Sequence, residues 1–141
     1  MEDPDVTAMK ANKDNRDYVL QAVKEKGKLL EFAAPEFQDD EEVVKTALEQ
    51  DGESMEFVSE RLKADKEVIM SSVKEYGQTL YFASEALRDD KEVVKAAVTN
   101  KGLIVKYASL RLRQDKEIVD IAVNQDKRAA MFCPCPSEDV S

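Results

Sequence analysis

Residues 83–102 read ASEALRDDKEVVKAAVTNKG, and residues 58–77 read VSERLKADKEVIMSSVKEYG, a close copy placed 25 residues earlier. The glycines mark the same interval, because the chain has only four of them and they are Gly27, Gly52, Gly77 and Gly102. Five blocks, which begin at residues 15, 40, 65, 90 and 115, follow one another without an insertion. A fixed period of this length is the signature of a stacked array of structural repeats.

Each repeat opens with the pattern of an amphipathic helix. In the second repeat, Asp40 stands where a side chain can accept hydrogen bonds from the free amides of a first helical turn. The apolar residues that follow recur at helical spacing, at Val43, Val44, Ala47 and Leu48. We expect Gly52 to close this helix in the left-handed conformation. The equivalent caps and helix ends are Asp65, Asp90 and Asp115, and Gly27, Gly77 and Gly102.

The column of aspartates has a second interpretation, a ladder of calcium sites. Helix capping explains the column better, because each aspartate precedes its helix by one residue. The glutamates and lysines beside them, such as Glu92 and Lys91, form a charged column in which each lysine can reach a glutamate of the next repeat. We interpret this network as a solvated face of the array.

The second half of each repeat predicts a shorter helix and a final capped turn. In the first repeat, Leu30, Ala33 and Phe37 fall at helical spacing, and Pro35 suits the first position of a helix. In the second repeat, Ser59 is placed to cap the last turn. A short strand is the alternative for the middle piece, since Met-Glu-Phe alternates at residues 55–57.

A repeat of 25 residues cannot bury its apolar stripe alone, so neighbouring repeats must cover it. The sequence therefore predicts an all-α fold, a short α-solenoid of five 25-residue helical repeats. Residues 1–14 are expected to form an N-terminal capping segment with Asp3 as the cap and Pro4 at the first helical position. Residues 15–126 form the repeat array.

Residues 127–141 are expected to be the degenerate end of the last repeat and an irregular C-terminal tail. Lys127 stands where the other repeats have glycine, and Pro134 and Pro136 stop any helix. The array therefore looks complete at this end, although a domain excised from a longer chain would end in the same way.

Composition narrows the classes of function. The net charge of −9 and the pI of about 4.7 would repel a phosphate backbone or an anionic bilayer, so neither nucleic acid nor membrane insertion is expected. No apolar run approaches the roughly 20 residues that span a membrane. The chain reads as soluble. The two cysteines are too few and too close to staple a secreted fold, which weakly favours a reducing compartment such as the cytoplasm.

No catalytic constellation, cofactor motif or metal site is predicted. The chain has no histidine and therefore no ordinary general base near neutral pH, and its glycines are isolated. Cys133 and Cys135 would be a thiol pair for redox or metal chemistry, but a lone CxC lacks two of the four ligands of zinc. Cys133 also falls at a small core position of the repeat.

The fourth repeat differs in kind from the others. Leu103, Ile104 and Leu110 replace residues that are mostly polar in other repeats. Residues 1–100 hold 24 acidic and 14 basic residues, whereas residues 101–128 hold 4 acidic and 7 basic ones. The cations nearest the leucines are Lys106, Arg111 and Arg113, together with Lys101 and Arg128. The pattern predicts a partner-docking surface with an apolar centre and a basic rim. The alternative is that Met131 and Phe132 fold back and cover it.

The motif DKEVVKAAV…G…YAS…LR.D resembles the repeats of the family called domain of unknown function 4116. In the fourth repeat and the turn that precedes it, the motif residues are Asp90, Lys91, Glu92, Val93, Val94, Ala97, Val98, Gly102, Tyr107, Ala108, Ser109 and Leu112. The resemblance covers residues 15 to about 126 and implies a helical repeat array. It implies no activity and no catalytic residues. The last repeat departs from the motif after Asp126, which places the tail outside the resemblance.

The resulting hypothesis is a non-enzymatic protein-binding scaffold or adaptor that docks a partner through its fourth repeat. One alternative is a structural or linker subunit buried in a larger assembly, and a minor one is a thiol protein that uses the C-terminal cysteines. The sequence predicts a protein partner and specifies neither its identity nor the oligomeric state.

Overall fold

The computed structural model describes residues 3–134, which form fifteen helices and no strand. This confirms the prediction of an all-α repeat fold and excludes the short strand within these residues. In this part of the chain, no helix is long and apolar enough to cross a membrane.

The chain folds as two compact units, residues 1–68 and 69–141, which meet within helix α6 (Lys66–Val73). The N-terminal unit contains α1 (Pro4–Ala11), α2 (Arg16–Glu25), the 3-10 helix η1 (Gly27–Phe32), α3 (Pro35–Gln38), α4 (Glu41–Gln50), η2 (Gly52–Phe57) and α5 (Glu60–Lys63). The C-terminal unit contains α7 (Thr79–Phe82), α8 (Glu85–Arg88), α9 (Lys91–Asn100), η3 (Gly102–Tyr107), α10 (Leu110–Arg113), α11 (Lys116–Gln125) and η4 (Lys127–Phe132).

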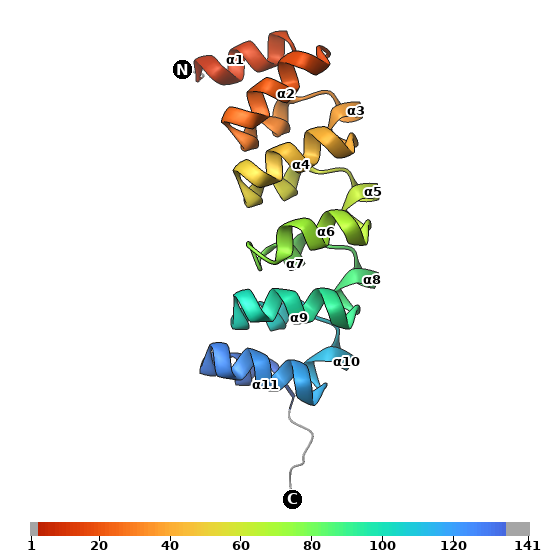
Figure 1. The fold of residues 1–141 in the computed structure, drawn as a ribbon, viewed down its shortest axis with the longest axis vertical. Coiled ribbons are helices and arrows are strands. Elements are labelled where there is room, and N and C mark those ends of the chain that lie inside the picture. The colour runs from red at the N-terminus through yellow and green to blue at the C-terminus, as the bar shows by residue number, and fades with distance from the viewer. Residues whose placement is uncertain (1–2, 135–141) are drawn as a thin grey trace, which may run out of the picture. The chain divides into compact units, whose positions relative to one another are not determined.

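Within each unit, equivalent helices of consecutive repeats pack against each other. Helix α2 lies beside α4 in the N-terminal unit, and α9 lies beside α11 in the C-terminal unit (Figure 1). The η helices form a second layer, in which η1 contacts η2 and η3 contacts η4. The apolar stripes face these contacts and are fully buried, as at Val19, Val44, Val94 and Ile118. Each such side chain contributes about 1.5–3 kcal/mol, which no repeat could obtain alone.

The aspartate at the start of each repeat satisfies the free amides of the helix that follows. The Asp40 carboxylate accepts from the backbone N–H of Glu42 and Val43, at 3.0 and 3.2 Å. The same pair of bonds forms at Asp65, Asp90 and Asp115. The aspartates are therefore helix caps in all four repeats that carry them, each worth about 1 kcal/mol.

The other caps also follow the sequence pattern. The Asp3 carboxylate accepts from the backbone N–H of Asp5 at 2.7 Å, and Pro4 opens α1. Ser59 accepts from the N–H of Leu62 at 3.3 Å, and Pro35 opens α3. The middle pieces differ from the expectation in one respect, since three of the four that follow a glycine are 3-10 helices of six residues.

The glycines do not close helices in the left-handed conformation that the sequence pattern suggested. No glycine among the described residues has a positive φ. The long helices of the first, second and fourth repeats end one residue before the glycine, at extended residues whose φ lies between −140° and −155°. Gly27, Gly52 and Gly102 then begin the next 3-10 helix. Glycine is needed here for another reason.

The reason is the close approach of the next repeat. A Cβ atom at Gly27 would collide with the carbonyl oxygen of Ala47, and one at Gly102 would collide with that of Ala122. At Gly77 the carbonyl oxygen of Ala97 would lie only 2.8 Å from it. The glycine N–H is satisfied across the same gap by a side-chain oxygen, with donor–acceptor pairs Gly27–Gln50 (2.7 Å), Gly77–Asn100 (2.8 Å) and Gly102–Gln125 (2.8 Å).

The fifth repeat keeps more structure than the sequence analysis predicts. Residues 127–132 form η4, which packs against η3 and α11. Ala129 is fully buried, and Cys133 is buried at a core position of the repeat. Lys127 is exposed, so a side chain is accommodated at this position. The irregular tail therefore does not begin at residue 127, and residues 135–141 lie outside the described part.

Candidate partner-docking surface

Arg111, one of the predicted docking residues, is engaged within the array. Its Nε lies 3.0 Å from Oδ1 of Asp89, and its Nη2 donates to the backbone carbonyl of Asp89 at 2.7 Å. The hydroxyl of Ser109 donates to the same carboxylate at 2.5 Å. These donors, Ser109 before Arg111, hold the pKa of Asp89 below its ordinary value. We call this three-residue arrangement the clip.

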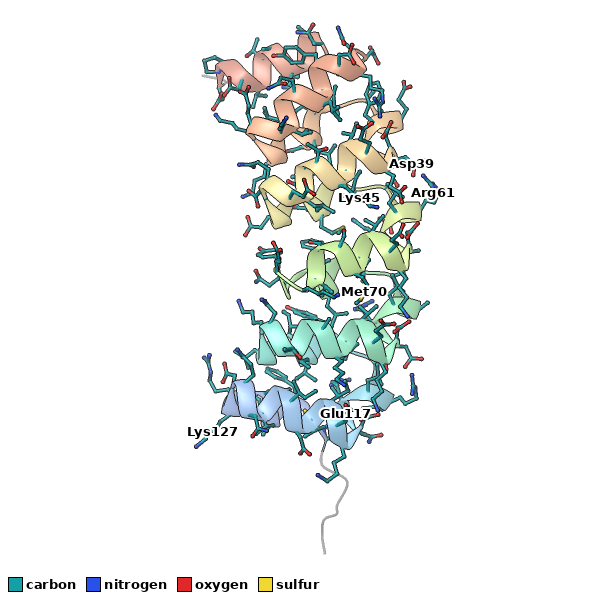
Figure 2. All side chains as sticks on the ribbon, viewed as in Figure 1. Asp39, Lys45, Arg61, Met70, Glu117 and Lys127 are labelled. Atoms are coloured by element: carbon teal, nitrogen blue, oxygen red, sulfur yellow. The ribbon has the colours of Figure 1, made fainter. Side chains whose placement is uncertain are left out.

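The N-terminal unit contains the same clip 50 residues earlier. The Asp39 carboxylate accepts from the hydroxyl of Ser59 at 2.6 Å and from Nε of Arg61 at 2.8 Å. Figure 2 shows Arg61 beside Asp39 at one edge of the ribbon. Because the arrangement recurs at an equivalent place, Arg111 serves first to join consecutive repeats.

Ile104 belongs to the core, which corrects its assignment to a docking surface. Its side chain is only 3% exposed. The equivalent residues of the other repeats are buried too, and they are Leu29, Ser54, Thr79 and Ala129. The polar residues in this column, Ser54 and Thr79, suggested exposure from the sequence, but the position faces inward in every repeat.

Leu103 and Leu110 lie at the two ends of η3. Leu103 is the second residue of η3 and is half-buried, whereas Leu110 opens α10 beyond the other end and is 55% exposed. A 3-10 helix of six residues is about 12 Å long. The two leucines therefore do not form one apolar centre with Ile104, as the sequence suggested.

A different set of residues forms a continuous exposed surface on the C-terminal unit. Tyr81 and Met131 stand at equivalent positions 50 residues apart, with side chains 54% and 75% exposed, and Lys106 stands between them. The ring of Tyr81 meets the ring of Tyr107 edge to face, with centroids 4.8 Å apart. We call Tyr81, Lys106, Tyr107, Met131 and Phe132 the aromatic surface.

Cations bind this aromatic surface together. The Nζ of Lys106 lies 5.1 Å from the ring centre of Tyr107 and 5.6 Å from that of Phe132. The guanidinium of Arg113 donates to the backbone carbonyl of Phe132 at 3.4 Å. A cation over an exposed aromatic ring is worth about 0.5–1 kcal/mol. Lys106 and Arg113, both predicted rim residues, therefore border rings and not the apolar centre proposed from the sequence.

The alternative in which Met131 and Phe132 cover a patch on the fourth repeat holds only for one of the two residues. Phe132 is half-buried beside Lys106. Met131 is largely exposed. It therefore adds to the exposed apolar area.

The family comparison agrees with this architecture. The DUF4116 model, described as a domain of unknown function, matches residues 15–63, 65–109 and 90–136. The chain belongs to the DUF4116 family. Its helical repeats are thus those of a family to which no function has been assigned. No curated protein and no solved structure matches the chain.

Each DUF4116 match covers about two of the 25-residue repeats. The third match extends to residue 136, well beyond Asp126, where the sequence resemblance was expected to end. This extension agrees with the formation of η4 by residues 127–132. Within the first match, the clip of Asp39 and Arg61 joins its two repeats, so the DUF4116 unit corresponds to a clipped pair.

The charged face of the DUF4116 repeats is neutralised internally. Lys91 lies 3.0 Å from a carboxylate oxygen of Glu117 and 3.2 Å from one of Asp115, while Lys95 lies 2.7 Å from Glu117. The two lysines, Lys95 before Lys91, lower the pKa of Glu117 to about 2. No group of three metal-ligating side chains occurs among residues 3–134. The face is a solvated ion-pair network of the kind that the sequence predicts.

Cys133 is the one cysteine in the described residues. Burial raises the pKa of its thiol, although Arg113 opposes the rise. A raised pKa leaves less of the thiolate that acts as nucleophile or metal ligand. The environment therefore suits packing better than thiol chemistry, and Cys135 lies outside the described residues.

Proposed function

We propose that this DUF4116 chain is a non-enzymatic scaffold or adaptor that docks a protein partner through its fourth repeat. The aromatic surface, with Leu110 at its edge, is the docking site. One observation carries the proposal: the large apolar side chains that are exposed in residues 3–134 are Tyr81, Leu110 and Met131, and all belong to the C-terminal unit.

The chemistry of the aromatic surface supports this role. Tyrosine, methionine and arginine are enriched in protein interfaces relative to the remaining surface. Tyrosine also offers a large contact area with few rotatable bonds, which lowers the entropic cost of binding. Lys106 adds a positive charge, which favours an oppositely charged partner and raises its rate of association.

A charge-reversing variant tests the proposal without a new kind of residue in the fold. The double variant Lys106→Glu, Leu110→Glu gives the fourth repeat the residues that the second repeat already carries, Glu56 and Glu60. Affinity purification from native extract with the tagged full chain should recover a partner with the wild type. The double variant should lose it.

The matched control carries the same change of charge on another face. Lys116→Glu and Asn124→Glu on α11 reproduce residues of the second repeat, Glu41 and Glu49. This control should retain the partner. Retention by the Lys106→Glu, Leu110→Glu variant as well would reject docking at the fourth repeat. Loss in both variants would favour a linker subunit held over much of its surface.

A further inference from the structure

Resting on the proposed docking function, we infer that the aromatic surface binds an extended segment of the partner protein in the polyproline II conformation. The segment carries proline or another apolar residue at every third position and carboxylates between them. Three properties of the aromatic surface lead to this partner: the spacing of its rings, its unpaired hydroxyl groups and its charge.

The spacing of the repeats matches the pitch of a polyproline II helix. Tyr107 and Phe132 occupy equivalent positions in consecutive repeats, and packed helical layers lie about 8–10 Å apart. Both rings lie within reach of the single ammonium group of Lys106. A polyproline II helix repeats every third residue, after about 9 Å. A segment along the array therefore places one side chain beside each ring.

The tyrosine hydroxyls suit such a backbone. Among residues 3–134, the hydroxyls of Tyr81 and Tyr107 make no hydrogen bond. A polyproline II helix has no internal hydrogen bonds, so its carbonyl groups can accept from outside. Aromatic surfaces that bind proline-rich segments exploit this property, and the preformed helix reduces the entropic cost of ordering. An α-helical partner satisfies its own carbonyls and would leave the hydroxyls without this acceptor.

The charge of the surface favours carboxylates in the segment. Lys106 has contacts with rings and with no carboxylate of the described residues. Arg113 donates to the backbone of Phe132, which leaves its positive charge uncompensated there. The nearest acidic group of the clip, Asp89, is paired with Arg111. An acidic segment would supply the counter-charges that the surface lacks.

A labelled peptide tests the inference on the full chain. The probe is a fluorescein-labelled 12-residue peptide made of four Glu-Pro-Pro units, and its binding is followed by fluorescence anisotropy. We expect saturable binding that weakens as salt increases. Peptides of four Glu-Gly-Ser units and four Lys-Pro-Pro units should each bind at least about tenfold more weakly, because they lack the preformed helix or the carboxylates.

Variants assign the binding to the aromatic surface. Tyr107→Ala should weaken the Glu-Pro-Pro peptide by about tenfold, whereas Tyr107→Phe keeps the ring and should weaken it less. Lys106→Gln should weaken binding and reduce its dependence on salt. The α11 control, Lys116→Glu with Asn124→Glu, should bind as the wild type does. Circular dichroism of each variant must match the wild type for the comparison to count.

The possible outcomes separate this inference from the docking function. No saturation by about 1 mM peptide, equal binding of the Glu-Gly-Ser peptide, or an unchanged affinity of Tyr107→Ala would each overturn the polyproline inference. If the Lys106→Glu, Leu110→Glu variant still loses its partner from extract, the docking function stands without it. A dimer in sedimentation equilibrium that Tyr107→Ala abolishes would identify a second copy as the occupant and would also overturn the inference.

Discussion

The two compact units are built from the same repeat, yet their exposed residues differ. At the position of Tyr81, Lys106 and Met131, the first two repeats have Glu31 and Glu56. The core residues, aspartate caps, glycine contacts and clips occur in both units. Features that are common to both units therefore explain the fold, and the column that differs is the best candidate for function.

Charge separates the units in the same sense. Residues 1–68 hold 19 acidic and 10 basic residues, a net charge of −9, whereas residues 69–141 hold 11 of each. The acidic character of the chain thus belongs entirely to its N-terminal unit. An average over the whole chain conceals a unit that does not repel an anionic partner.

The largest expected effect tests a feature that the two units share, the glycine contact. Gly27→Val and Gly102→Val should each lower the free energy of unfolding by about 3 kcal/mol, because a side chain would collide with a backbone carbonyl of the next repeat. Urea denaturation followed by circular dichroism measures the change. Lys127→Val, at the equivalent exposed position of the fifth repeat, is the control and should change little. Equal effects at all three positions would contradict the close-approach explanation.

A second test exploits a buried polar position that differs between the units. In the C-terminal unit, the hydroxyl of Thr79 lies 2.8 Å from that of Ser72, so Thr79→Val should cost about 1–2 kcal/mol by leaving Ser72 without this partner. In the N-terminal unit, the buried hydroxyl of Ser54 has no partner. Ser54→Ala should therefore stabilise the protein by up to about 1 kcal/mol. Thermal unfolding of both variants checks the opposite signs, and destabilisation by Ser54→Ala would refute the assignment.

The aspartate caps should contribute equally in both units. Asp40→Ala and Asp115→Ala should each lower the free energy of unfolding by about 1 kcal/mol, since each removes the acceptor of two backbone amides. Asn at these positions keeps an oxygen for the amides and should cost less. Chemical denaturation of the four variants measures this. A cost confined to one unit would show that the caps are not equivalent.

The smallest expected effect is the pH dependence of the clips. Ser59 and Arg61 lower the pKa of Asp39 below its ordinary value of 3.8, and the partners of Asp89 act in the same way. A group whose pKa is lowered by folding stabilises the fold above its unfolded pKa, and this contribution is lost as the pH falls towards its folded pKa. The effect is small because both carboxylates are exposed.

Melting temperatures measured between pH 6 and pH 3 test this prediction. The wild type should lose stability towards pH 3, and the loss should be smaller in Asp39→Asn and in Asp89→Asn by similar amounts. A steeper loss in either variant than in the wild type would contradict the sign of the effect.

The sequence predicts the frame of the molecule because the frame is repeated. The period of the glycines, the caps at Asp40 and Ser59, and the first helix from Pro4 all follow from local chemistry that a single repeat displays. The reason for each glycine does not, since the atom that approaches Gly27 lies 20 residues further along the chain, in Ala47. Local patterns suggest a helix end at such a glycine, and only the packed neighbour reveals the close contact.

The candidate site was less accessible from the sequence. Replacement of polar residues by Ile104 indicated a surface change, but that column faces the core. The exposure of Met131 could not be read from its type, because a methionine is more often buried. A comparison of residues at 25-residue intervals from Glu31 would have shown the change from acidic to aromatic and basic side chains. That comparison requires the knowledge of which columns face solvent.

The recurrence of the clip every 50 residues sets the length by which the chain can be edited. If residues 40–89 were deleted, Asp39 would meet Ser109 and Arg111 in place of Ser59 and Arg61, with the same intervals between them. If residues 40–64 were deleted, Asp39 would meet Ala86 where the arginine belongs. Cassettes of 50 residues should therefore be removed or duplicated with every arginine–aspartate pair intact, whereas a cassette of 25 breaks one.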